Sequence, residues 1–435
     1  MKTFDFTTKH PSGMPKNVAN IPLIKLLLSK IPANMRESMM PSLFPHLAAH
    51  MTEATFLYTD NTFISPYMMD LTCICSGGGK SSAGKVKEAI DRDLLEHDRE
   101  SRKKLADWQK KRSCAGANKT KEPRPDDASL WKPDADMTKP AMLLNMAACE
   151  LDGKHPMLIE TPEVDMLNQL AGGHKMVSKA LRVFGDEKPW GAVRATADGV
   201  TVSPVMGVCM DNNGTEETVR QFFRSDLHTG GLWRVAIAYT PRADRLRKIP
   251  RQGTIDEAWL EKLDGYLGLL KACKGQFQIK PLIRLMDTLR EEICDFCDLA
   301  DDDDIDDCSK RSATNAFRKG CVLWVANGMK WTKAIEDAVR YFFYLDIWSK
   351  MRLFKPMLEK ALNDDADTTR KGGVKNMLDS LPDSFSEPQL EALRSESGKP
   401  KEGTKDQLRV WRNRGFIEYS AQTQLYTKTA TYLNR

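Results

Sequence analysis

The chain of 435 residues is long enough for two or three domains and for a sizeable buried core. Its charged fraction of 29% and apolar fraction of 41% are those of an ordinary soluble globular protein, and no apolar run reaches the length of about 18 residues that indicates a membrane span. The start MKTFDFTTKHPSG lacks the apolar core of a signal peptide, so we expect a cytoplasmic protein with reduced cysteines. A formal charge of +5 is weak evidence for nucleic-acid binding, because solubility alone can explain it.

The N-terminal third predicts a helical region, then strands, then a long helix. Residues 15–50 alternate apolar clusters and polar spacers at helical spacing, which predicts a helical region over 1–55. The stretch ATFLYTDNTFISPYMMDLTCIC favours two strands with a turn at TDN, the second ending at SGGGKSS. After the glycines, AGKVKEAIDRDLLEHDRESRKKLADWQKKR predicts one long charged helix, whose basic part is either a DNA-facing surface or a solvated face. Residues 113–135 read as an exposed loop.

The next segments predict an α/β domain over 56–250. A helix and a turn precede a short apolar strand that ends on Glu160, and further strands follow at VSPVMGVCMD and LWRVAIAY with a helix between them. Short buried strands that alternate with helices are typical of a largely parallel sheet. Residues 251–370 predict a helical lid region, interrupted by a solvated acidic loop at 297–308. Residues 371–435 predict three short helices and a strand-turn-strand, the layout of a winged helix-turn-helix.

The stretch TCICSGGGKSSAGK has the composition of a phosphate-binding loop between a strand and a helix. Such a loop needs inward-facing backbone N–H groups, a lysine for the outer phosphates and a hydroxyl for Mg²⁺. The candidate residues for ATP are Gly77, Gly78, Gly79, Lys80, Ser81 and Ser82, with Ser81 also on the metal. Ile74 stands where the motif G-x-x-x-x-G-K-[ST] begins with glycine. The alternative is a glycine-rich turn with an incidental lysine.

Three further positions supply side chains for phosphoryl transfer. A metal-holding carboxylate at the end of a neighbouring strand is offered by Glu160, with Glu163 just beyond it. Asn212 lies at the end of the strand VMGVCMDNN and could position water or sense the γ-phosphate, although Asn-Asn-Gly is also a strong turn sequence. Arg234 follows a glycine turn, where it could reach the phosphate of a neighbouring subunit or form a structural ion pair.

The order of these elements resembles helicase-like P-loop proteins of bacterial mobile elements and prophages, related to the helicase halves of primase-helicases. The similarity covers about residues 20 to 350 and rests on FISPYMMDLTCICSGGGKSS, LIETPEVDML, VMGVCMDNNGTEETVRQFF and GGLWRVAIAYTPR. It implies a RecA-like or AAA+-like core in which Lys80 and Ser81 bind phosphate and metal, and Glu160 or Glu163 has the Walker-B role. It further implies a sensor role for Asn212 and an arginine-finger role for Arg234. The implied cofactors are ATP and Mg²⁺, and the implied assembly is a homo-oligomer such as a hexamer.

Two smaller patterns leave alternatives open. Cys294, Cys297, Cys308 and Cys321 include one CxxC and could hold zinc, but the second pair is widely spaced and Cys321 reads as a buried residue of a helix. Arg318 in the same helix could sense nucleotide, although a solvent-facing arginine is the simpler interpretation.

The C-terminal region predicts a DNA-binding surface made of Lys401, Lys405, Arg409, Arg412 and Arg414. Spacings of four and three place Lys405, Arg409 and Arg412 on one helical face, as a recognition helix requires, with the buried side supplied by Leu408, Val410 and Trp411. A protein-contacting winged helix is the alternative. The whole chain therefore predicts a DNA-dependent ATPase, a ring-forming helicase-like motor for replication or mobilisation of a genetic element. The other hypothesis is a non-catalytic DNA-binding replication initiator or regulator with a degenerate loop.

Overall fold

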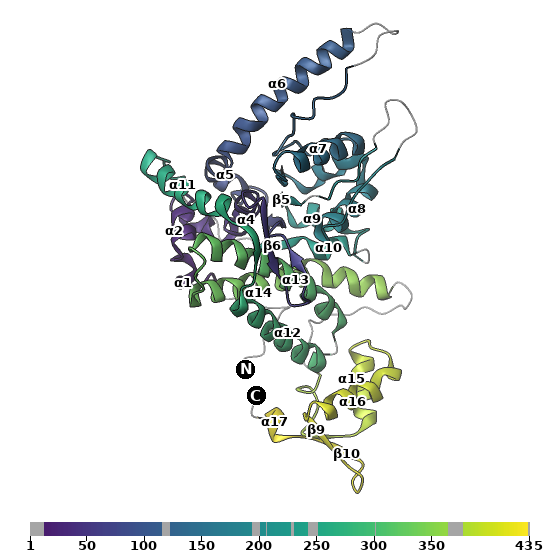
Figure 1. Ribbon diagram of the computed structural model, residues 1–435. Coiled ribbons are helices and arrows are strands. Elements are labelled where there is room, and N and C mark those ends of the chain that lie inside the picture. The colour runs from purple at the N-terminus through teal and green to yellow at the C-terminus, as the bar shows by residue number, and fades with distance from the viewer. Residues whose placement is uncertain are drawn as a thin grey trace.

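The computed structural model describes residues 13–114, 122–193, 201–205, 207–227, 230–241, 251–300, 302–363 and 377–433. It has an α/β fold with a parallel sheet at its centre, as the sequence predicted (Figure 1). None of the described helices is both long enough and apolar enough to cross a membrane.

The central sheet has four strands in the order β4-β5-β3-β6, and every neighbouring pair is parallel. These strands are β3 (Met69–Ile74), β4 (Met157–Thr161), β5 (Val208–Gly214) and β6 (Ala236–Thr240). All residues of β3 and β5 are buried, as is typical of a parallel sheet that is covered on both faces. The chain after β3 crosses to the outer strand β4 and returns to β5, so the carboxyl ends of β3 and β4 are separated by one strand. An open crevice at such a crossing point is where α/β sheets usually bind ligands.

Helices occupy the described part of the predicted N-terminal region 1–55 as far as Ala48, whereas its last three residues belong to a strand. Its helices are α1 (Lys16–Ala19), α2 (Pro22–Leu28), α3 (Arg36–Met39) and α4 (Phe44–Ala48). A hairpin of β1 (Glu53–Leu57) and β2 (Phe63–Ile64) follows at the predicted turn, and β1 also pairs in parallel with β7 (Lys274–Phe277). The expected second strand does not run on to the glycines. It stops at Ile64 because the Ser65 N–H donates to the Glu187 carboxylate (3.1 Å) and Pro66 has no N–H, and β3 is a separate strand.

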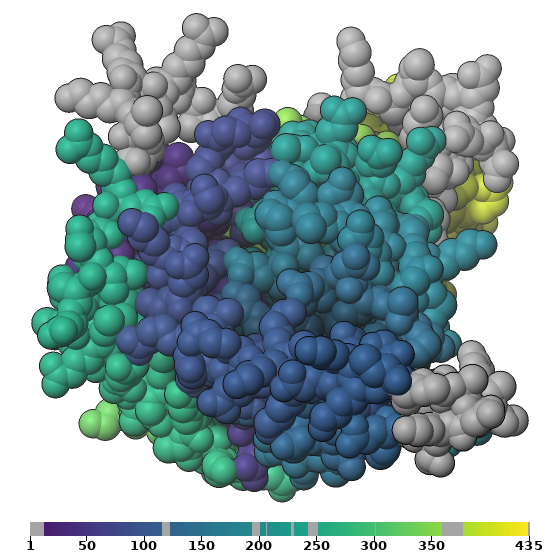
Figure 2. Space-filling model, turned by 90° about the horizontal axis from the view of Figure 1, so that it is seen from above, coloured from purple at the N-terminus to yellow at the C-terminus, as the bar shows by residue number. Residues whose placement is uncertain are grey.

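The helix predicted after the glycines is divided. A 3₁₀ turn (Lys80–Ala83) leads into α5 (Gly84–Ile90), and α6 (Arg92–Cys114) begins after a break at Asp91. The described residues 122–138, which form neither a helix nor a strand, lead to α7 (Lys139–Leu151). Seen from above, the blue surface of α6 lies between the green surface of α11 and the teal surface of the segment that contains α7 and α8 (Figure 2).

The expected exposed loop at 113–135 is wrong over residues 128–132. Ala128 and Ser129 are fully buried, and the N–H groups of Trp131 and Lys132 donate to the Asp98 carboxylate (2.7 and 2.8 Å). The Trp131 carbonyl accepts from the Leu158 N–H of β4 (2.7 Å). The segment is buried because its backbone groups find partners in α6 and in the sheet, which composition does not reveal.

Beyond the sheet the connecting helices are α8 (His174–Gly185), α9 (Glu216–Phe223) and α10 (Gly231–Arg234), and a 3₁₀ segment spans Val164–Gly172. The region predicted as helical from about residue 255 contains α11 (Glu257–Ala272), α12 (Lys280–Ala300), α13 (Asp303–Ala326) and α14 (Lys333–Asn363), but β7 interrupts it between α11 and α12. One hydrophobic core runs from Val18 to Leu358, so the predicted N-terminal, central and helical regions are packed together in the described structure.

The acidic stretch at 297–308 is not the expected solvated loop. Its described residues form the end of α12 and the start of α13, where Asp302 caps the helix by accepting the Ile305 N–H. Lys355 pairs with Asp302 (2.9 Å) and Asp304 (2.7 Å). Acidic residues stabilise a helix at its N-terminus because they complement the helix dipole, so a run of aspartates is compatible with a helix start.

The four cysteines cannot share one zinc ion. Cys308 and Cys321 lie on the same helix, 13 residues apart, which corresponds to about 20 Å at 1.5 Å per residue. Cys321 is fully buried, as predicted, and burial raises its pKa well above the usual value.

The C-terminal region contains β8 (Ser384–Phe385), α15 (Glu387–Glu396), α16 (Thr404–Asn413), β9 (Ile417–Ser420), β10 (Leu425–Lys428) and α17 (Ala430–Leu433). The predicted strand-turn-strand is present and forms an antiparallel sheet in the order β8-β10-β9. Of the first expected helix, residues 377–380 form a turn instead, and 371–376 lie outside the described residues. This unit has its own core around Trp411 and Phe385, which also includes Leu299 of α12.

Candidate functional site

The glycine loop follows β3 at the carboxyl end of the central sheet. Ile74 is the last residue of β3 and is buried, and a Cβ on Gly78 would lie 2.7 Å from Ile74 Cγ1 and 2.8 Å from the Cys75 carbonyl oxygen. The loop therefore accommodates the bulky residue at the first motif position only because residue 78 is glycine. Gly79 has a left-handed conformation (φ +89°), which L-residues rarely adopt, and the next residue is Lys80.

Lys80 and Glu163 face each other across this end of the sheet. The Lys80 ammonium group forms an ion pair with Glu163 Oε1, although the residues are 83 positions apart in sequence. The side chains are 18% and 38% exposed, so the pair is open to solvent on one side. Glu163 Oε2 has no hydrogen-bond partner among the described residues. Of the two candidate glutamates, Glu163 is thus the one that contacts the lysine of the loop.

The two serines of the loop differ in their surroundings. Ser81 is exposed, and its carbonyl accepts a hydrogen bond from Gln252 Nε2 (3.2 Å). Ser82 is buried, and its hydroxyl has no partner within the described part of the chain. The exposed loop residue Gly77 has φ +72°, and a Cβ there would meet no atom within 4 Å.

Glu160 belongs to a different set of contacts from Glu163. Its carboxylate accepts from Lys132 Nζ (2.7 Å) and lies 3.6 Å from Lys87 Nζ of α5. Burial by itself raises the pKa of this carboxyl, but His46, Lys87 and Lys132 lower it below the usual value. If Glu160 bound a metal ion, as predicted, its carboxylate would first have to lose its contacts with Lys87 and Lys132.

The ring of His46 lies at the centre of the same network. Its Nδ1 is 2.8 Å from Asp91 Oδ2 and its Nε2 is 3.1 Å from Asp211 Oδ2, so both ring nitrogens must donate and the imidazole is protonated. Burial lowers the pKa of His46, but the Asp91 charge and the hydrogen bonds to Asp211 and Asp91 raise it to about 9. The pKa of Asp91 is lowered to about 2, because His46 and Lys132 outweigh its burial.

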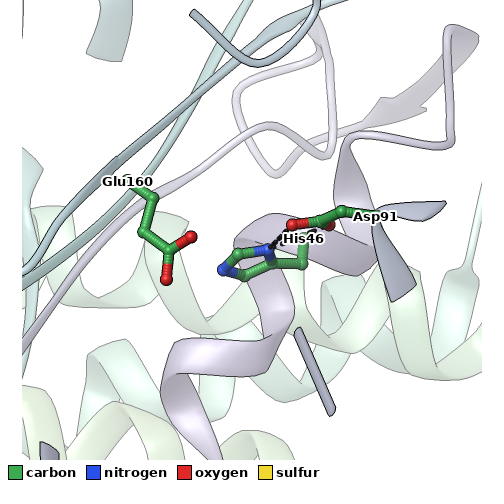
Figure 3. A group of neighbouring side chains, drawn as sticks. All are labelled: His46, Asp91 and Glu160. Carbon is green, nitrogen blue, oxygen red and sulfur yellow. Dashed lines mark hydrogen bonds and ion pairs between the residues drawn. The ribbon is translucent and has the colours of Figure 1, made fainter. Parts of the chain in front are cut away.

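His46, Asp91 and Glu160 are close enough to ligate a metal, and Figure 3 shows the His46 ring between the two carboxylates. They are instead bridged by protein cations, because Lys132 Nζ is 2.7 Å from both Asp91 Oδ2 and Glu160 Oε2, and Lys87 contacts Asp211. The network contains as many cations as carboxylates, and its members are His46, Lys87, Lys132, Asp91, Glu160 and Asp211. A charge-balanced group whose histidine is protonated is a structural ion-pair network and not a metal centre.

Of this network, sequence reasoning selected only Glu160 as a candidate. It missed the other five members, which are His46, Lys87, Lys132, Asp91 and Asp211. The one available signal was the lysine at position 87, which interrupts the apolar face of a helix packed on the sheet. His46 and Lys132 lay in segments predicted as a helical spacer and an exposed loop, and they gave no signal. Burial against Asp211 and Glu160 is what gives them a role, because a buried charge requires a partner.

Asn212 and Asn213 lie inside β5 and not in a turn. Asn212 Oδ1 accepts from the Thr161 hydroxyl (2.8 Å) and its Nδ2 donates to the Asp70 carbonyl (3.3 Å), which joins β5 to both neighbouring strands. Asn213, one residue nearer the carboxyl end, pairs in register with Thr72 of β3. Asn213 Oδ1 and Thr72 Oγ1 are both buried without a partner among the described residues. The turn alternative for Asn-Asn-Gly is wrong because the strand extends through Gly214.

Arg234 ends α10 and precedes β6, so it lies at the amino end of the sheet, opposite the glycine loop. Its guanidinium donates two hydrogen bonds to Asp186 (3.0 and 2.6 Å), which also pairs with Arg311 (3.0 Å). The structural ion pair that the sequence left open is therefore present. Within one chain Arg234 is remote from Lys80, so contact with nucleotide requires a neighbouring subunit.

Arg318 is buried, which contradicts the expected solvent-facing position. It donates to Glu187 Oε1 (2.7 Å), and this carboxylate also accepts from the Ser65 hydroxyl (2.8 Å). Arg318 thus ties α13 to the connection between β2 and β3.

The basic residues of the C-terminal region are exposed, as expected for a binding surface, and they are Lys401, Lys405, Arg409, Arg412 and Arg414. The opposite side of α16 is buried through Leu408 and Trp411, while Val410 is only partly buried. Trp411 Nε1 donates to the Asp298 carbonyl of α12 (2.9 Å), and Arg414 pairs with the Asp298 carboxylate (2.6 Å). Arg414 therefore joins this unit to α12, whereas the other four point to solvent.

Comparison with known proteins adds no assignment: no protein-family model matches this chain, and no curated protein sequence matches it.

Proposed function

We propose that the protein is a DNA-dependent ATPase of the P-loop type with a C-terminal winged helix that binds duplex DNA. The observation that carries the proposal is the contact of Lys80 with Glu163 at the carboxyl end of the central strands. A lysine from a glycine loop and a carboxylate just beyond the end of a second strand are the two charges that phosphoryl transfer requires beside a metal ion. The tertiary structure brings together two residues that sequence reasoning selected separately.

The surroundings of this pair support a phosphate site. Gly78 and Gly79 bring the loop backbone into contact with Ile74 and Met35, where a Cβ would lie 2.7 Å from Ile74 Cγ1 and 2.8 Å from Met35 Sδ. Buried oxygens without partners belong to Ser82, Thr72 and Asn213, and such groups usually bind water or a ligand. These features fit ATP with Mg²⁺.

In this proposal, Lys80 would hold the outer phosphates and Gly77 to Ser82 would line them. Ser81, Glu163 and, after release from its lysines, Glu160 are the candidate groups for the metal and its water shell. When bound, Mg²⁺ supplies charge neutralisation for the transferred phosphoryl group. Glu163 would orient the attacking water, and Asn212 holds β5 in register beside the loop.

Arg234 is the candidate finger in a homo-oligomer such as a hexamer. Its position at the opposite sheet edge suits contact with the next subunit's nucleotide, and Asp186 would have to release it first. The C-terminal unit would bind duplex phosphates through Lys401, Lys405, Arg409 and Arg412.

The test is a DNA-stimulated ATPase assay on the wild type and on Lys80→Ala. We expect measurable hydrolysis in the wild type and its loss in the variant, because the loop lysine contacts phosphates directly. If the wild type does not hydrolyse ATP, or if Lys80→Ala hydrolyses it at an unchanged rate, the proposed ATPase activity is refuted. DNA binding without hydrolysis would then support the non-catalytic adaptor.

A further inference from the structure

A hollow on the described surface lies away from the loop, between α2 and α11. It encloses about 870 Å³, and its lining includes Lys25, Leu26, Lys30, Lys262, Gly265 and Tyr266. The two helices lie side by side in Figure 1, and the Trp259 indole N–H closes the floor by donating to the Leu26 carbonyl (3.0 Å). We call this hollow the α2–α11 groove.

The charge of the groove is positive. Lys30 is neutralised by Asp256 (3.2 Å), but Lys25 and Lys262 are exposed and have no carboxylate within ion-pair distance among the described residues. Beside them, Tyr266 is partly exposed and Leu269 is 42% exposed. Lysines interleaved with an aromatic ring and apolar side chains are typical of surfaces that bind single-stranded nucleic acid, with phosphates on the lysines and bases on the ring.

Two glycines in the middle of α11 are unexplained by the chain itself. A Cβ on Gly265 or on Gly268 would meet no atom within 4 Å, and neither residue has a positive φ. Glycine in a helix interior is destabilising relative to alanine, so a glycine without a packing reason is unusual. At the groove wall, Gly265 leaves the helix backbone open to close approach from outside.

The groove is connected to the glycine loop by a short series of hydrogen bonds. The Gly253 N–H donates to the Lys30 carbonyl (2.9 Å), and the adjacent Gln252 side chain donates to the Ser81 carbonyl (3.2 Å). A Cβ on Gly253 would lie 3.0 Å from Lys30 Cα, so the segment passes very close to the end of α2. Anything that moves Lys30 in the groove therefore acts on a segment that touches the loop.

From these observations we infer that the α2–α11 groove binds a single-stranded nucleic acid segment, and that Gln252 couples its occupation to the phosphate loop. The inferred nucleic-acid binding depends only on the groove, whereas the inferred coupling depends on the proposed ATPase activity. This surface is distinct from the basic face of α16, which we assign to duplex DNA.

The binding test uses fluorescently labelled oligo(dT) and the intact protein. The double variant Lys25→Glu/Lys262→Glu should bind at least about tenfold more weakly, and the slope of log affinity against log salt should fall by about 1.4 for two lost phosphate contacts. Lys175→Glu/Lys179→Glu on α8, which changes two exposed lysines by the same charge, is the matched control and should bind like the wild type. Tyr266→Ala should weaken binding roughly 5- to 150-fold through lost stacking.

Gly265→Leu separates loss of binding from loss of folding. Leucine has a higher helix propensity than glycine, and its Cβ would meet no atom within 4 Å, so the variant should be at least as stable as the wild type while its side chain extends into the groove. Weaker oligo(dT) binding in this stable variant supports the inference. Unchanged oligo(dT) binding in both Gly265→Leu and the double lysine variant overturns the inference. A changed oligomeric state with unchanged oligo(dT) binding also overturns it, because the groove would then be a protein interface.

The coupling test compares hydrolysis with and without oligo(dT). Gln252→Ala should keep oligo(dT) affinity and lose most of the stimulation, whereas equal stimulation in the wild type and variant would refute the coupling. If the wild type hydrolyses no ATP at all, the proposed ATPase fails, but the binding results still decide the groove.

Discussion

The Lys80 ammonium group contacts the Glu163 carboxylate across the carboxyl end of the central sheet, while Glu160, three residues earlier, is held by Lys87 and Lys132. The sequence left open which of the two glutamates has the metal-binding role, and the structure places them in different surroundings. Glu163 faces the loop and solvent, and Glu160 belongs to the charge-balanced network.

Glu163→Gln should reduce ATP hydrolysis by about 100-fold or more and leave nucleotide binding largely intact, because a group that orients the attacking water acts in the chemical step. Steady-state hydrolysis and equilibrium titration with a fluorescent ATP analogue measure the two effects. Glu160→Gln is the matched variant and should instead lower the free energy of unfolding by about 2 kcal/mol, since it leaves two lysines with fewer partners. The reverse pattern would exchange the roles of the two residues.

The His46 network predicts a loss of stability at high pH. Because folding raises the pKa of His46 from 6.5 to about 9, its contribution is fully present below pH 6.5 and is lost as pH rises through about 9. The shift corresponds to stabilisation on the order of 3 kcal/mol. Urea unfolding at pH 7 and pH 10 should show the decrease, and His46→Gln should be less stable at pH 7 with a flatter dependence on pH. An equally steep decrease in His46→Gln would assign the effect to other groups.

Gly78→Ala should destabilise the loop by about 1–3 kcal/mol and weaken nucleotide binding, because its Cβ would overlap Ile74 and the Cys75 carbonyl. Adding Ile74→Ala should restore part of the loss, since it removes one of the two obstacles. Gly84→Ala is the control: a Cβ there meets no atom within 4 Å, and the residue is helical, so stability should be equal or higher. Thermal unfolding and nucleotide titration of the four proteins test the expectation, and a harmless Gly78→Ala would contradict it.

Arg409→Ala/Arg412→Ala should weaken duplex DNA binding at low salt and reduce the salt slope by about 0.9 for each lost phosphate contact. Arg414→Ala should instead loosen the contact of the C-terminal unit with Asp298 and lower the unfolding temperature more than it changes the slope. Fluorescence anisotropy over a range of salt concentrations separates the two. A slope unaffected by the double variant would favour a protein-binding role for α16.

The sequence by itself determined the elements whose local pattern is strong. The buried strands β4 and β6 consist largely of apolar residues because both faces of a parallel sheet are covered, and α16 separates into charged and apolar sides because only one side is buried. The glycine loop and the candidates Lys80 and Glu163 were selected from residue type and position alone. Each of these signals lies within a few consecutive residues.

Only the tertiary structure decided which charged residues meet. The buried segment at 128–132, the break at Asp91 and the helical acidic stretch were mispredicted because their polar groups find partners far away in the sequence: Asp98, His46 and Lys355. A buried charge is stabilised only by a nearby opposite charge or hydrogen-bonding group, and composition gives no distance between residues. The same physical requirement explains why Glu160 and Glu163 have different lysine partners.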